Sequence, residues 1–346
     1  MNRMNLLKPY KLQKGDTIGV FTPSSPAYCV NEGLFLNGIK NMEKLGFNVK
    51  LGFLTEKRAS QGYRSGSPQD RAQELMDLIR DDEVEALIST IGGMNSSSLI
   101  PYLDFGLIRE KRKIICGYSD VTSLHLSILK YAGLKTLYGP ALMTWFGEYP
   151  DGVEESTRSF LKATMNNLSQ PRVIEPFKRW SNHSRNWSNG DWKNIPREWK
   201  ENKGWKVVNP GIVKGEIVVA NLNTLMSSAG TDYFPELEGK ILLIEEMSAP
   251  WSQEERSLRQ LQLMGVFDVI AGLVVGKVEM PDRQGASFGL DELVSEVIGQ
   301  RDFPVISEFD CSHTIPMHTM GERCLVSIEA QADYNVTFTI LDSFVE

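Results

Sequence analysis

A serine at the junction of a strand and a helix is the residue of this chain best placed to do chemistry. In the stretch KIICGYSDVTSLHLSILKY, an apolar run at 114–116 reaches Gly117, and apolar residues then recur at helical spacing from Val121. This pattern predicts a buried strand that turns sharply into a helix, with Ser119 on the turn. The unpaired N–H groups that open a helix favour developing negative charge, so Ser119 is placed as nucleophilic serines are in α/β enzymes.

A helix cap is the alternative role for this serine. Ser and Asp are favoured at helix N-caps, so Ser119 or Asp120 could simply satisfy an orphan N–H group. The usual nucleophile turn has glycine two residues on either side of the serine, and here Gly117 fits that pattern while Val121 does not. A catalytic reading therefore requires a partner base elsewhere in the chain.

Histidine is scarce, so a serine hydrolase has few candidate bases. The four histidines are His125, His183, His313 and His318. His125 falls on the apolar face of the helix after Ser119 and is predicted to be a core residue. His313 lies in a polar, proline-bounded loop and is the better candidate.

Such a base also needs a group that fixes its tautomer, usually a carboxylate. The apolar run at 241–244 ends in Glu245 and Glu246, and acids at the end of a buried strand suit this role. The same two acids are equally typical of solvent-facing charges at a strand end. Their combination with Ser119 and His313 favours the catalytic interpretation.

The first half of the chain alternates strands and helices. Apolar runs predict strands at 16–22, 47–51, 86–90, 114–116 and 135–138, and segments with helical spacing lie between them. This alternation is typical of a mostly parallel sheet, in which ligands bind beyond the carboxyl ends of the strands. Ser119 and the glycine pair at 92–93 both fall at that edge.

The rest of the chain begins with a polar segment that is unusually rich in tryptophan. The five tryptophans are Trp180, Trp187, Trp192, Trp199 and Trp205. Exposed indoles invite aggregation, so we expect most of them to be pinned to the protein and one or two to face a ligand. Strands then recur at 215–220, 240–244 and 271–278, with paired strands at 324–341 and a helix capped by Ser252 and Glu255. We therefore expect a domain at 1–170, a linker or substrate loop at 171–209, and a second domain at 210–346.

Composition excludes several functional classes. The 346 residues are 41% hydrophobic and 23% charged, as in ordinary soluble proteins, and the net charge of -7 without a long basic run argues against nucleic acid as a partner. No apolar stretch is long enough for a membrane span or a signal peptide, so we expect a cytoplasmic protein without a membrane partner. The four cysteines are widely scattered, which predicts free thiols and no metal site.

Four motifs in this order resemble the LD-carboxypeptidase family of serine peptidases, and specifically its microcin C immunity (MccF-type) branch. They are IGGMNSSSLIPYLDF, GYSDVTSLH, ILLIEEMSAPW and FDCSHTIPM. The resemblance implies an α/β fold, with an N-terminal, mostly parallel α/β sandwich (flavodoxin- or Rossmann-like) and a smaller C-terminal α+β domain of mixed strands. It also implies a homodimer that works without a metal or an organic cofactor.

The resemblance further implies a role for each candidate site residue. Ser119 would be the nucleophile, His313 the general base and then acid, and Glu245 the acid that orients the imidazole. Glu245 is preferred over Glu246 because the family's acid directly follows the apolar strand. The N–H of Asp120 and an N–H of the glycine loop, at Gly93, would form the oxyanion hole.

The substrate implied by the branch is an aminoacyl group joined through an amide to a nucleotide-like moiety, a small molecule. An adenine ring needs an aromatic plate, and by resemblance Trp180 or Trp187 would supply it. Asn221 is a candidate ligand, although Val219 and Ala220 stand where family members often carry a glycine pair, which puts a close backbone contact there in doubt.

Two other functions remain open from the sequence. The same triad would serve a cytoplasmic L,D-carboxypeptidase that removes the terminal D-alanine from murein tetrapeptides, with Arg64 a possible partner for the substrate carboxylate. In a non-enzyme, a small-ligand binding protein, Ser119 would be only a helix cap and the tryptophans a partner surface.

Overall fold

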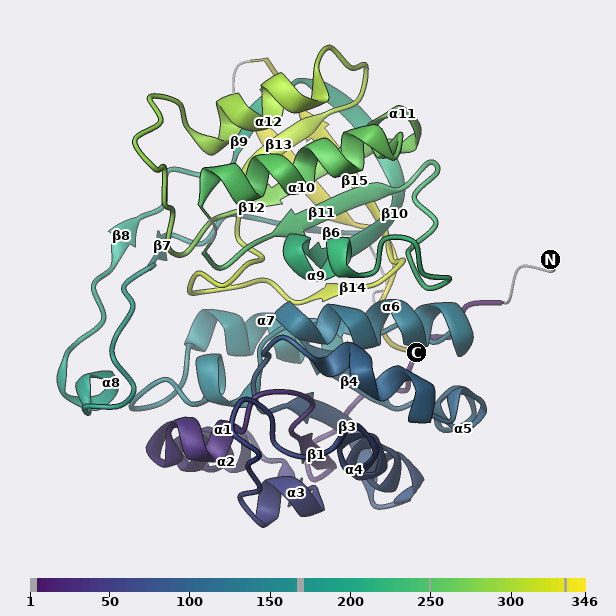
Figure 1. Cartoon of the computed structure of the whole chain (residues 1–346), viewed down its shortest axis with the longest axis vertical. Coiled ribbons are helices and arrows are strands. Elements are labelled where there is room, and N and C mark those ends of the chain that lie inside the picture. Colours follow the sequence, from purple (N-terminus) through teal and green to yellow (C-terminus); the bar gives the residue numbers. More distant parts are fainter. Residues whose placement is uncertain (1–4, 167–170, 249, 333–334) are drawn as a thin grey trace.

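The computed structural model describes residues 5–166, 171–248, 250–332 and 335–346, and it consists of two halves, each built on its own sheet (Figure 1). The purple and blue N-terminal half forms the lower part of the view, and the green and yellow C-terminal half lies above it. No described helix is both long and apolar enough to cross a membrane.

The N-terminal sheet is mostly parallel, as predicted. Its strands are β1 (Thr17–Phe21), β2 (Asn48–Leu51), β3 (Val84–Ser89), β4 (Ile114–Gly117), β5 (Leu137–Tyr138) and β14 (Met320–Gly321). They lie in the order β14-β5-β4-β3-β1-β2, and the five strands from the first half of the chain pair in parallel. β14 comes from near the end of the chain and pairs antiparallel with β5. The C-terminal part of the chain thus contributes one strand to the N-terminal sheet.

Helices cover both faces of this sheet because successive strand residues point to opposite sides. Ala86 and Ile88 of β3 join one buried cluster, while Leu87 between them joins another. The helical elements of this half are α1 (Ala27–Val30), α2 (Glu32–Lys44), α3 (Phe53–Glu56), α4 (Pro68–Arg80), η1 (Ser96–Tyr102), α5 (Phe105–Lys111), η2 (Ser119–Val121), α6 (Thr122–Tyr131), η3 (Leu142–Phe146) and α7 (Glu154–Thr164). The faces of α4, α5 and α6 pack on one side of the sheet, and those of α2 and α7 on the other.

The C-terminal sheet mixes strand directions, as predicted. Its strands are β6 (Arg172–Ile174), β9 (Lys206–Asn209), β10 (Gly211–Asn221), β11 (Ile241–Glu245), β12 (Gly272–Gly276), β13 (Val305–Phe309), β15 (Leu325–Ala330) and β16 (Val336–Ile340). The strands from β10 to β13 are parallel neighbours, and the other pairings of this sheet are antiparallel. β6 and β9 lie near the two ends of the tryptophan-rich segment, so the ends of that segment belong to this sheet.

Four helices follow the strands of the C-terminal half. They are α9 (Leu222–Ser227), α10 (Trp251–Leu263), α11 (Val266–Val269) and α12 (Leu290–Ile298). The capping box predicted at Ser252 and Glu255 is wrong: the helix start lies two residues earlier, with Pro250 as the N-cap and no side-chain cap. The start is instead fixed by the buried Trp251, whose N–H donates to the carbonyl of Asp282 at 2.9 Å.

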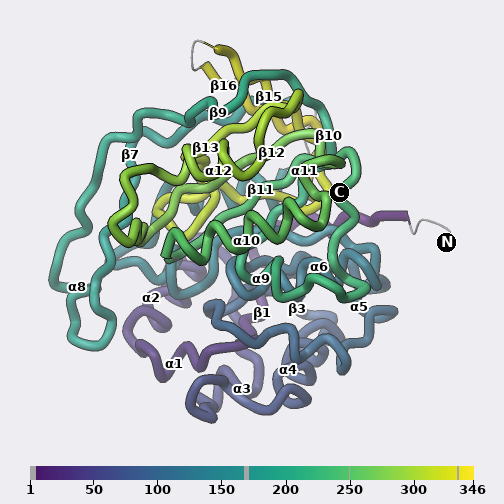
Figure 2. Tube along the Cα trace, turned by 45° about the horizontal axis from the view of Figure 1, so that its top comes forward, coloured from purple at the N-terminus to yellow at the C-terminus, as the bar shows by residue number. Residues whose placement is uncertain are grey.

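The tryptophan-rich segment between β6 and β9 runs outside both halves. It carries β7 (Arg179–Trp180), α8 (Asp191–Asn194) and β8 (Lys200–Glu201). Both views show this teal segment leaving the C-terminal half and bringing α8 down beside α2 of the N-terminal half (Figures 1 and 2). Beneath it, one continuous buried cluster extends from α2 and β3 into β10 and β11, so the two halves are packed together.

Candidate active site

Ser119 lies directly beyond the carboxyl end of β4, in the short 3₁₀ helix η2 that precedes α6. Its φ of 61° is in the left-handed region, a strained conformation typical of functional turns. The neighbouring Gly117 cannot be replaced freely, because a Cβ there would lie 2.7 Å from Ser89 Oγ. The predicted strand-to-helix turn is therefore confirmed, and it resembles the turns that carry nucleophilic serines in α/β enzymes.

Ser119 does not cap a helix, and the neighbouring Asp120 binds the start of a different helical element. Neither η2 nor α6 has a side-chain cap. The carboxylate of Asp120 instead accepts the N–H groups of Asn95 and Ser96 at 2.9 and 2.8 Å, at the start of η1. Asp120 thus ties the glycine loop to the serine turn, and the Ser119 hydroxyl is not used as a helix cap.

His313 and Glu245 form a buried pair across the end of the C-terminal sheet. The Nδ1 of His313 lies 2.7 Å from Glu245 Oε2, and the His313 backbone N–H donates to the same oxygen at 3.2 Å. Because a carboxylate only accepts, Nδ1 carries the proton and Nε2 is left with its lone pair. Burial alone would lower the pKa of His313, but the charges of Glu245, Glu279 and Glu246 and the bond to Glu245 raise it above its ordinary value.

The second carboxylate oxygen of Glu245 is held just as firmly. Tyr138, the last residue of β5, donates its hydroxyl to Glu245 Oε1 at 2.5 Å, and Asn221 Nδ2 donates to the same atom at 3.2 Å. Tyr138 Oη also accepts the N–H of Ser119 at 2.9 Å. A continuous chain of hydrogen bonds therefore runs from the serine turn through Tyr138 and Glu245 to His313, across both halves of the molecule.

Asn221 and Glu246 lie outside the cavity and support the site indirectly. Asn221 caps α9 with its side-chain oxygen, donates to both Glu245 and Glu246, and is only 3% exposed. Glu246 accepts the backbone N–H of Asn223 at 3.1 Å. The structure therefore places Asn221 as a support of Glu245 and not in the wall of the cavity, and it places Glu245, not Glu246, against His313.

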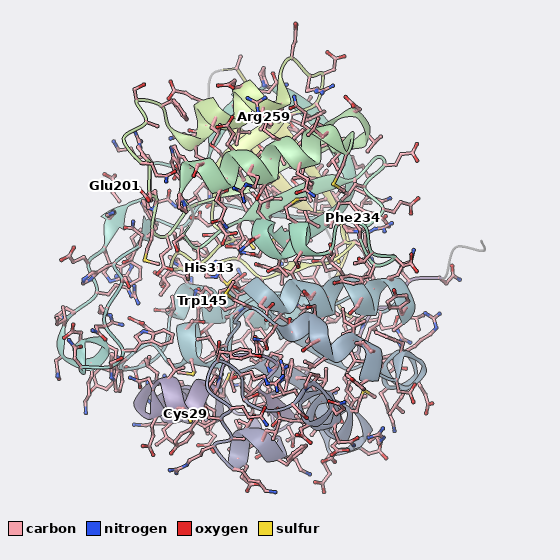
Figure 3. All side chains as sticks on the ribbon, viewed as in Figure 1. Cys29, Trp145, Glu201, Phe234, Arg259 and His313 are labelled. Carbon is pink, nitrogen blue, oxygen red and sulfur yellow. The ribbon has the colours of Figure 1, made fainter. Side chains whose placement is uncertain are left out.

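Ser119 and His313 line one cavity of about 570 Å³, although they are 194 positions apart in the chain. The ring of Tyr118 packs against both His313 and Trp145, with centroid distances of 4.7 and 4.5 Å. Figure 3 labels His313 directly above Trp145, at the level where the two halves meet. The cavity thus opens at the junction of the halves.

The glycine loop after β3 forms the wall next to Ser119. A Cβ on Gly92 would lie 3.2 Å from Ser119 Oγ and 3.5 Å from the backbone N of Asp120, so this glycine leaves open the space beside the Ser119 hydroxyl. Gly93 has a φ of 153° and would meet Ser24 Oγ at 2.2 Å with any side chain. Gly92, Gly93 and Met94 all line the cavity.

The far wall of the cavity comes from the tryptophan-rich segment. Two arginines of this segment, Arg185 and Arg197, bind the carboxylate of Glu148, which precedes the segment in the chain. Arg197 contacts both carboxylate oxygens at 2.9 Å. Trp187 also lines the cavity, but Trp180 does not: its ring packs against the ammonium groups of Lys200 and Lys277. Of the two tryptophans predicted to stack on a base, only Trp187 is in position.

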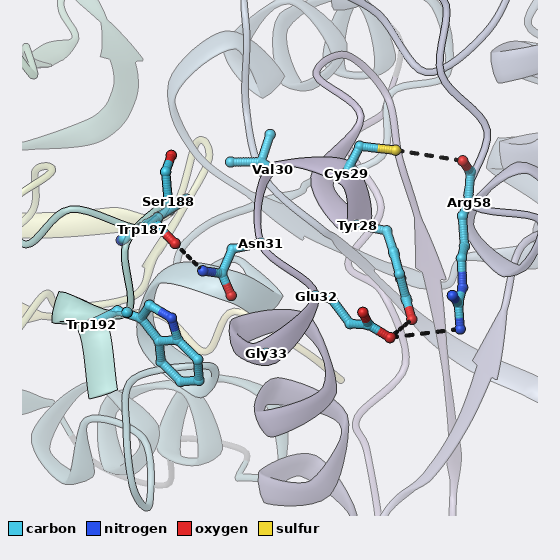
Figure 4. Close-up of a pocket in the computed structure, with 11 residues that line it drawn as sticks. Tyr28, Cys29, Val30, Asn31, Glu32, Gly33, Arg58, Trp187, Ser188 and Trp192 are labelled. Atoms are coloured by element: carbon cyan, nitrogen blue, oxygen red, sulfur yellow. Dashed lines mark hydrogen bonds and ion pairs between the residues drawn. The ribbon is translucent and has the colours of Figure 1, made fainter. Parts of the chain in front are cut away.

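Trp187 also borders a second, more open hollow of about 670 Å³ between the segment and the start of α2 (Figure 4). Asn31 donates its side-chain amide to the Trp187 carbonyl there. The ring of Trp192 lies so close to Gly33 that a Cβ on this glycine would be 2.3 Å from it. These contacts fasten the segment to the start of α2.

Two of the other histidines are structural, whereas His183 lines the cavity, where its Nδ1 accepts the backbone N–H of Glu198 at 3.1 Å. His125 is fully buried, bonds the Gly117 carbonyl at 3.0 Å, and burial lowers its pKa to about 4, which confirms the predicted core histidine. His318 stacks on Phe177 and bonds the Glu175 carbonyl at 3.1 Å, and its pKa is also lowered to about 4 by burial. Neither lines the cavity.

Sequence reasoning missed Tyr138, Glu279 and the cluster of Glu148 with two arginines. Tyr138 gave a weak signal, as the last residue of a predicted strand and hence at the ligand-binding edge of the sheet. Glu279 follows β12 in the same way that Glu245 ends β11. The arginines gave no signal, because their segment has no helical or strand period that would predict which way their side chains point.

Comparison with known proteins shows the family of this chain. The model of the LD-carboxypeptidase N-terminal domain matches residues 18–139, and that of the C-terminal domain matches residues 214–326. The microcin C7 self-immunity protein MccF of Escherichia coli is 38% identical over 89% of this chain and 89% of its own. A protein of Bacillus subtilis named "Probable murein peptide carboxypeptidase" is 31% identical over 89% of this chain and 87% of its own.

Solved structures of MccF superimpose closely on this fold. MccF in complex with glutamyl sulfamoyl guanosine gives a TM-score of 0.92 at 35% identity, covering 98% of this chain and 100% of that one. A tryptophan-to-phenylalanine mutant of MccF in complex with adenosine monophosphate gives the same values. An MccF-like protein of Bacillus anthracis gives a TM-score of 0.86 at 31% identity, covering 97% and 99% of the two chains.

Proposed function

Because the chain belongs to the LD-carboxypeptidase family and is a serine peptidase of the MccF-like kind, we propose that it hydrolyses the amide between an aminoacyl group and a nucleotide-like moiety. The observation that carries this proposal is that one cavity is lined by Ser119, His313 and Trp187. A serine with a candidate general base and an aromatic residue in the same cavity suit a substrate that joins an acyl group to a nucleobase.

In the proposed mechanism, Ser119 Oγ attacks the carbonyl carbon and its proton passes to Nε2 of His313. His313 then gives that proton to the leaving nitrogen as the carbon–nitrogen bond breaks, which leaves an ester on Ser119. Water attacks this ester with His313 again as the base, and the amino acid and the free serine are released. Glu245 stabilises the imidazolium in both steps through its bond to Nδ1.

The proposed oxyanion hole consists of the N–H groups of Gly93 and Asp120. Gly93 lines the cavity beside Ser119, and the described residues include no acceptor for its N–H. The open space at Gly92 lies 3.5 Å from the N of Asp120. Asp120 holds the two donors in register by binding the loop residues that follow Gly93. Backbone donors fixed in this way are the usual means of stabilising a tetrahedral intermediate.

Trp187 is the proposed plate for the base of the substrate. Its backbone is fastened by Asn31, so the ring is presented from a fixed support. Stacking on one aromatic ring contributes about 1–3 kcal/mol per base, and we expect the Trp187→Ala variant to lose binding of the nucleotide part by that amount. Trp199, which packs on Arg179 and is 37% exposed, offers a matched control in the same segment.

Cleavage of murein tetrapeptides is the second candidate, favoured by the Bacillus subtilis relative named for that activity. It requires a cation for the terminal carboxylate of the substrate. Arg64 bonds Gln61 and does not line the cavity, and Arg185 and Arg197, which do line it, share the single carboxylate of Glu148. The nucleotide substrate stays the first candidate because Trp187 lines the same cavity.

Product analysis by mass spectrometry separates the two candidates. Purified wild type and Ser119→Ala would each be incubated with glutamyl-sulfamoyl-adenosine and with a murein tetrapeptide. We expect the wild type to release glutamate from the first compound and the variant to release none. Release of D-alanine from the tetrapeptide, with the nucleotide compound left intact, would overturn the proposal in favour of the second candidate.

A further inference from the structure

Glu254 is a carboxyl group at a position where the packing of α10 calls for an apolar residue. Trp251, Glu254 and Leu258 follow one another at helical spacing on the buried face of this helix, and Glu254 is only 4% exposed. Its carboxyl group forms no hydrogen bond or ion pair with any described residue. A buried carboxylate in this state is costly, so the group needs either a partner or a proton.

Glu254 shares a small cavity with the two acids at the end of β11. The cavity measures about 10 Å³, enough for at most one water molecule, and shares no residue with the cavity that Ser119 and His313 line. Glu245 and Glu246 are the titratable groups that face Glu254 across it. The residues that α9, β12 and α12 contribute to its described lining are apolar or glycine. No cation therefore lies in this lining to compensate a charge on Glu254.

Hydrogen-bond donors decide which of the three acids carries a proton. The carboxylates of Glu245 and Glu246 each accept at least three N–H or O–H groups. Such donors stabilise the charged form of a carboxyl group, and Glu254 has none among the described residues. Burial, followed by the charges of Glu246 and Glu245, raises the pKa of Glu254 to about 8. Glu254 therefore holds the proton at neutral pH.

We infer that Glu254 is a positioning residue that supports Glu245 and Glu246 only while it is uncharged, and that its ionisation sets an alkaline limit to the activity. The kinetic part of this inference rests on the proposed function. Ionisation of Glu254 puts a third negative charge into an apolar shell that offers it no donor. Relief requires the start of α10 and the end of β11 to move apart, and this movement displaces the acid that orients His313.

The same proton makes the fold sensitive to alkaline pH. The pKa of Glu254 rises from 4.5 to about 8 on folding, so its contribution to stability is complete below 4.5 and is lost as the pH rises through about 8. Glu322 is fully buried and has a pKa that burial also raises to about 8, but it does not line the small cavity. Urea unfolding on both sides of this pH should show a smaller alkaline loss of stability than the wild type in Glu254→Gln and in the matched variant Glu322→Gln.

Kinetics separate the two buried acids. We expect kcat/KM of the wild type for glutamyl-sulfamoyl-adenosine to fall above about pH 8. In Glu254→Gln this fall should move up by at least about one pH unit, and in Glu322→Gln it should stay where it is in the wild type. Glu254→Leu should behave like Glu254→Gln, because the effect depends on the charge and not on a hydrogen bond. The fall at low pH, which the proposed base His313 sets, should stay in place in all of them.

Infrared spectroscopy detects the proton on Glu254 without any substrate. The C=O band of protonated carboxylic acids in the wild type at neutral pH should be weaker in Glu254→Gln. Equal bands, or equal alkaline midpoints of kcat/KM, would overturn the inference and leave the proposed function standing. A wild type that does not cleave the nucleotide compound at any pH would refute the proposed function, and the infrared and urea measurements would still decide whether Glu254 holds a proton.

Discussion

Tyr138 joins the two halves of the candidate site through hydrogen bonds to both. Its hydroxyl accepts from the Ser119 N–H and donates to Glu245, so it sets the serine turn and the orienting acid relative to one another. Burial, followed by the charge of Glu245, raises its pKa well above the ordinary value. The hydroxyl therefore stays protonated and remains a donor to Glu245 over the working range of pH.

The Tyr138→Phe substitution removes both of these bonds and keeps the ring. A hydrogen bond to a charged group is worth about 1.5–3 kcal/mol, so we expect kcat/KM to fall at least about tenfold with a smaller change in substrate binding. Steady-state kinetics on glutamyl-sulfamoyl-adenosine, with circular dichroism to check the fold, measures this. Unchanged kinetics would show that Tyr138 does not position the site.

The pH dependence of the reaction follows from the raised pKa of His313. The base acts only when neutral, so kcat/KM must fall as the pH drops through this pKa, and the midpoint should lie above the ordinary value of about 6.5. Removing the negative charge of Glu279 makes the imidazolium less stable, so Glu279→Gln should move the midpoint to lower pH. Profiles of kcat/KM for wild type, Glu279→Gln and the control Glu201→Gln test this; a shift to higher pH would contradict it.

At the level of elements, four neighbouring parallel strands deliver the C-terminal part of the site. β10 and β11 end at Asn221 and Glu245, Glu279 follows β12, and His313 follows β13. The carboxyl ends of these strands meet those of β4 and β5 from the other sheet through the Tyr138–Glu245 bond. Each catalytic candidate thus sits at the sheet edge where ligands bind in α/β folds.

The loop between β3 and η1 limits what can stand next to the nucleophile. In Gly92→Ala the new methyl group would lie 3.1 Å from Ser119 Cβ and 3.2 Å from its Oγ. Displacement of reacting atoms by about 1 Å can cost on the order of 100-fold in rate, and we expect a loss of that size in kcat/KM with the fold intact. Gly106→Ala in α5, where only Asp104 Oδ1 lies within 4 Å, is the control. Equal activity in the two variants would show that this loop does not shape the site.

These elements also show how far the sequence could lead. Apolar runs predicted β1 to β5 and β10 to β12 well, because buried parallel strands read as continuous hydrophobic stretches. The same runs predicted which residues stand at the strand ends, including Ser119 and Glu245. They could not predict the course of the tryptophan-rich segment, because its contacts are made by single side chains, such as Trp192 on Gly33, that follow no period.

For the whole molecule, the buried pair of Lys277 and Asp310 anchors that segment to the C-terminal half. Their side chains are 1% and 0% exposed. Asp310 also accepts from Trp205 Nε1 at 3.0 Å and from the Phe177 N–H at 3.2 Å, at both ends of the segment. The pair therefore couples the wall that carries Trp187 to the loop that carries His313.

The homodimer implied by the family resemblance stays a prediction.

The Asp310→Asn substitution should destabilise the whole chain. Breaking a buried ion pair leaves an uncompensated charge and costs about 3–5 kcal/mol in the free energy of unfolding. Asp151→Asn breaks the exposed pair with Lys44 and should leave that free energy nearly unchanged. Urea unfolding of both variants gives the comparison, and similar midpoints would contradict the anchoring role.

Labelling with a serine-directed fluorophosphonate tests the central claim, a Ser119 nucleophile activated by His313, without any assumption about the substrate. Peptide mapping by mass spectrometry after reaction with the wild type should find the phosphonyl group on Ser119, and His313→Ala should react far more slowly. Labelling of another residue, or labelling of Ser119 at the same rate in His313→Ala, would contradict the account.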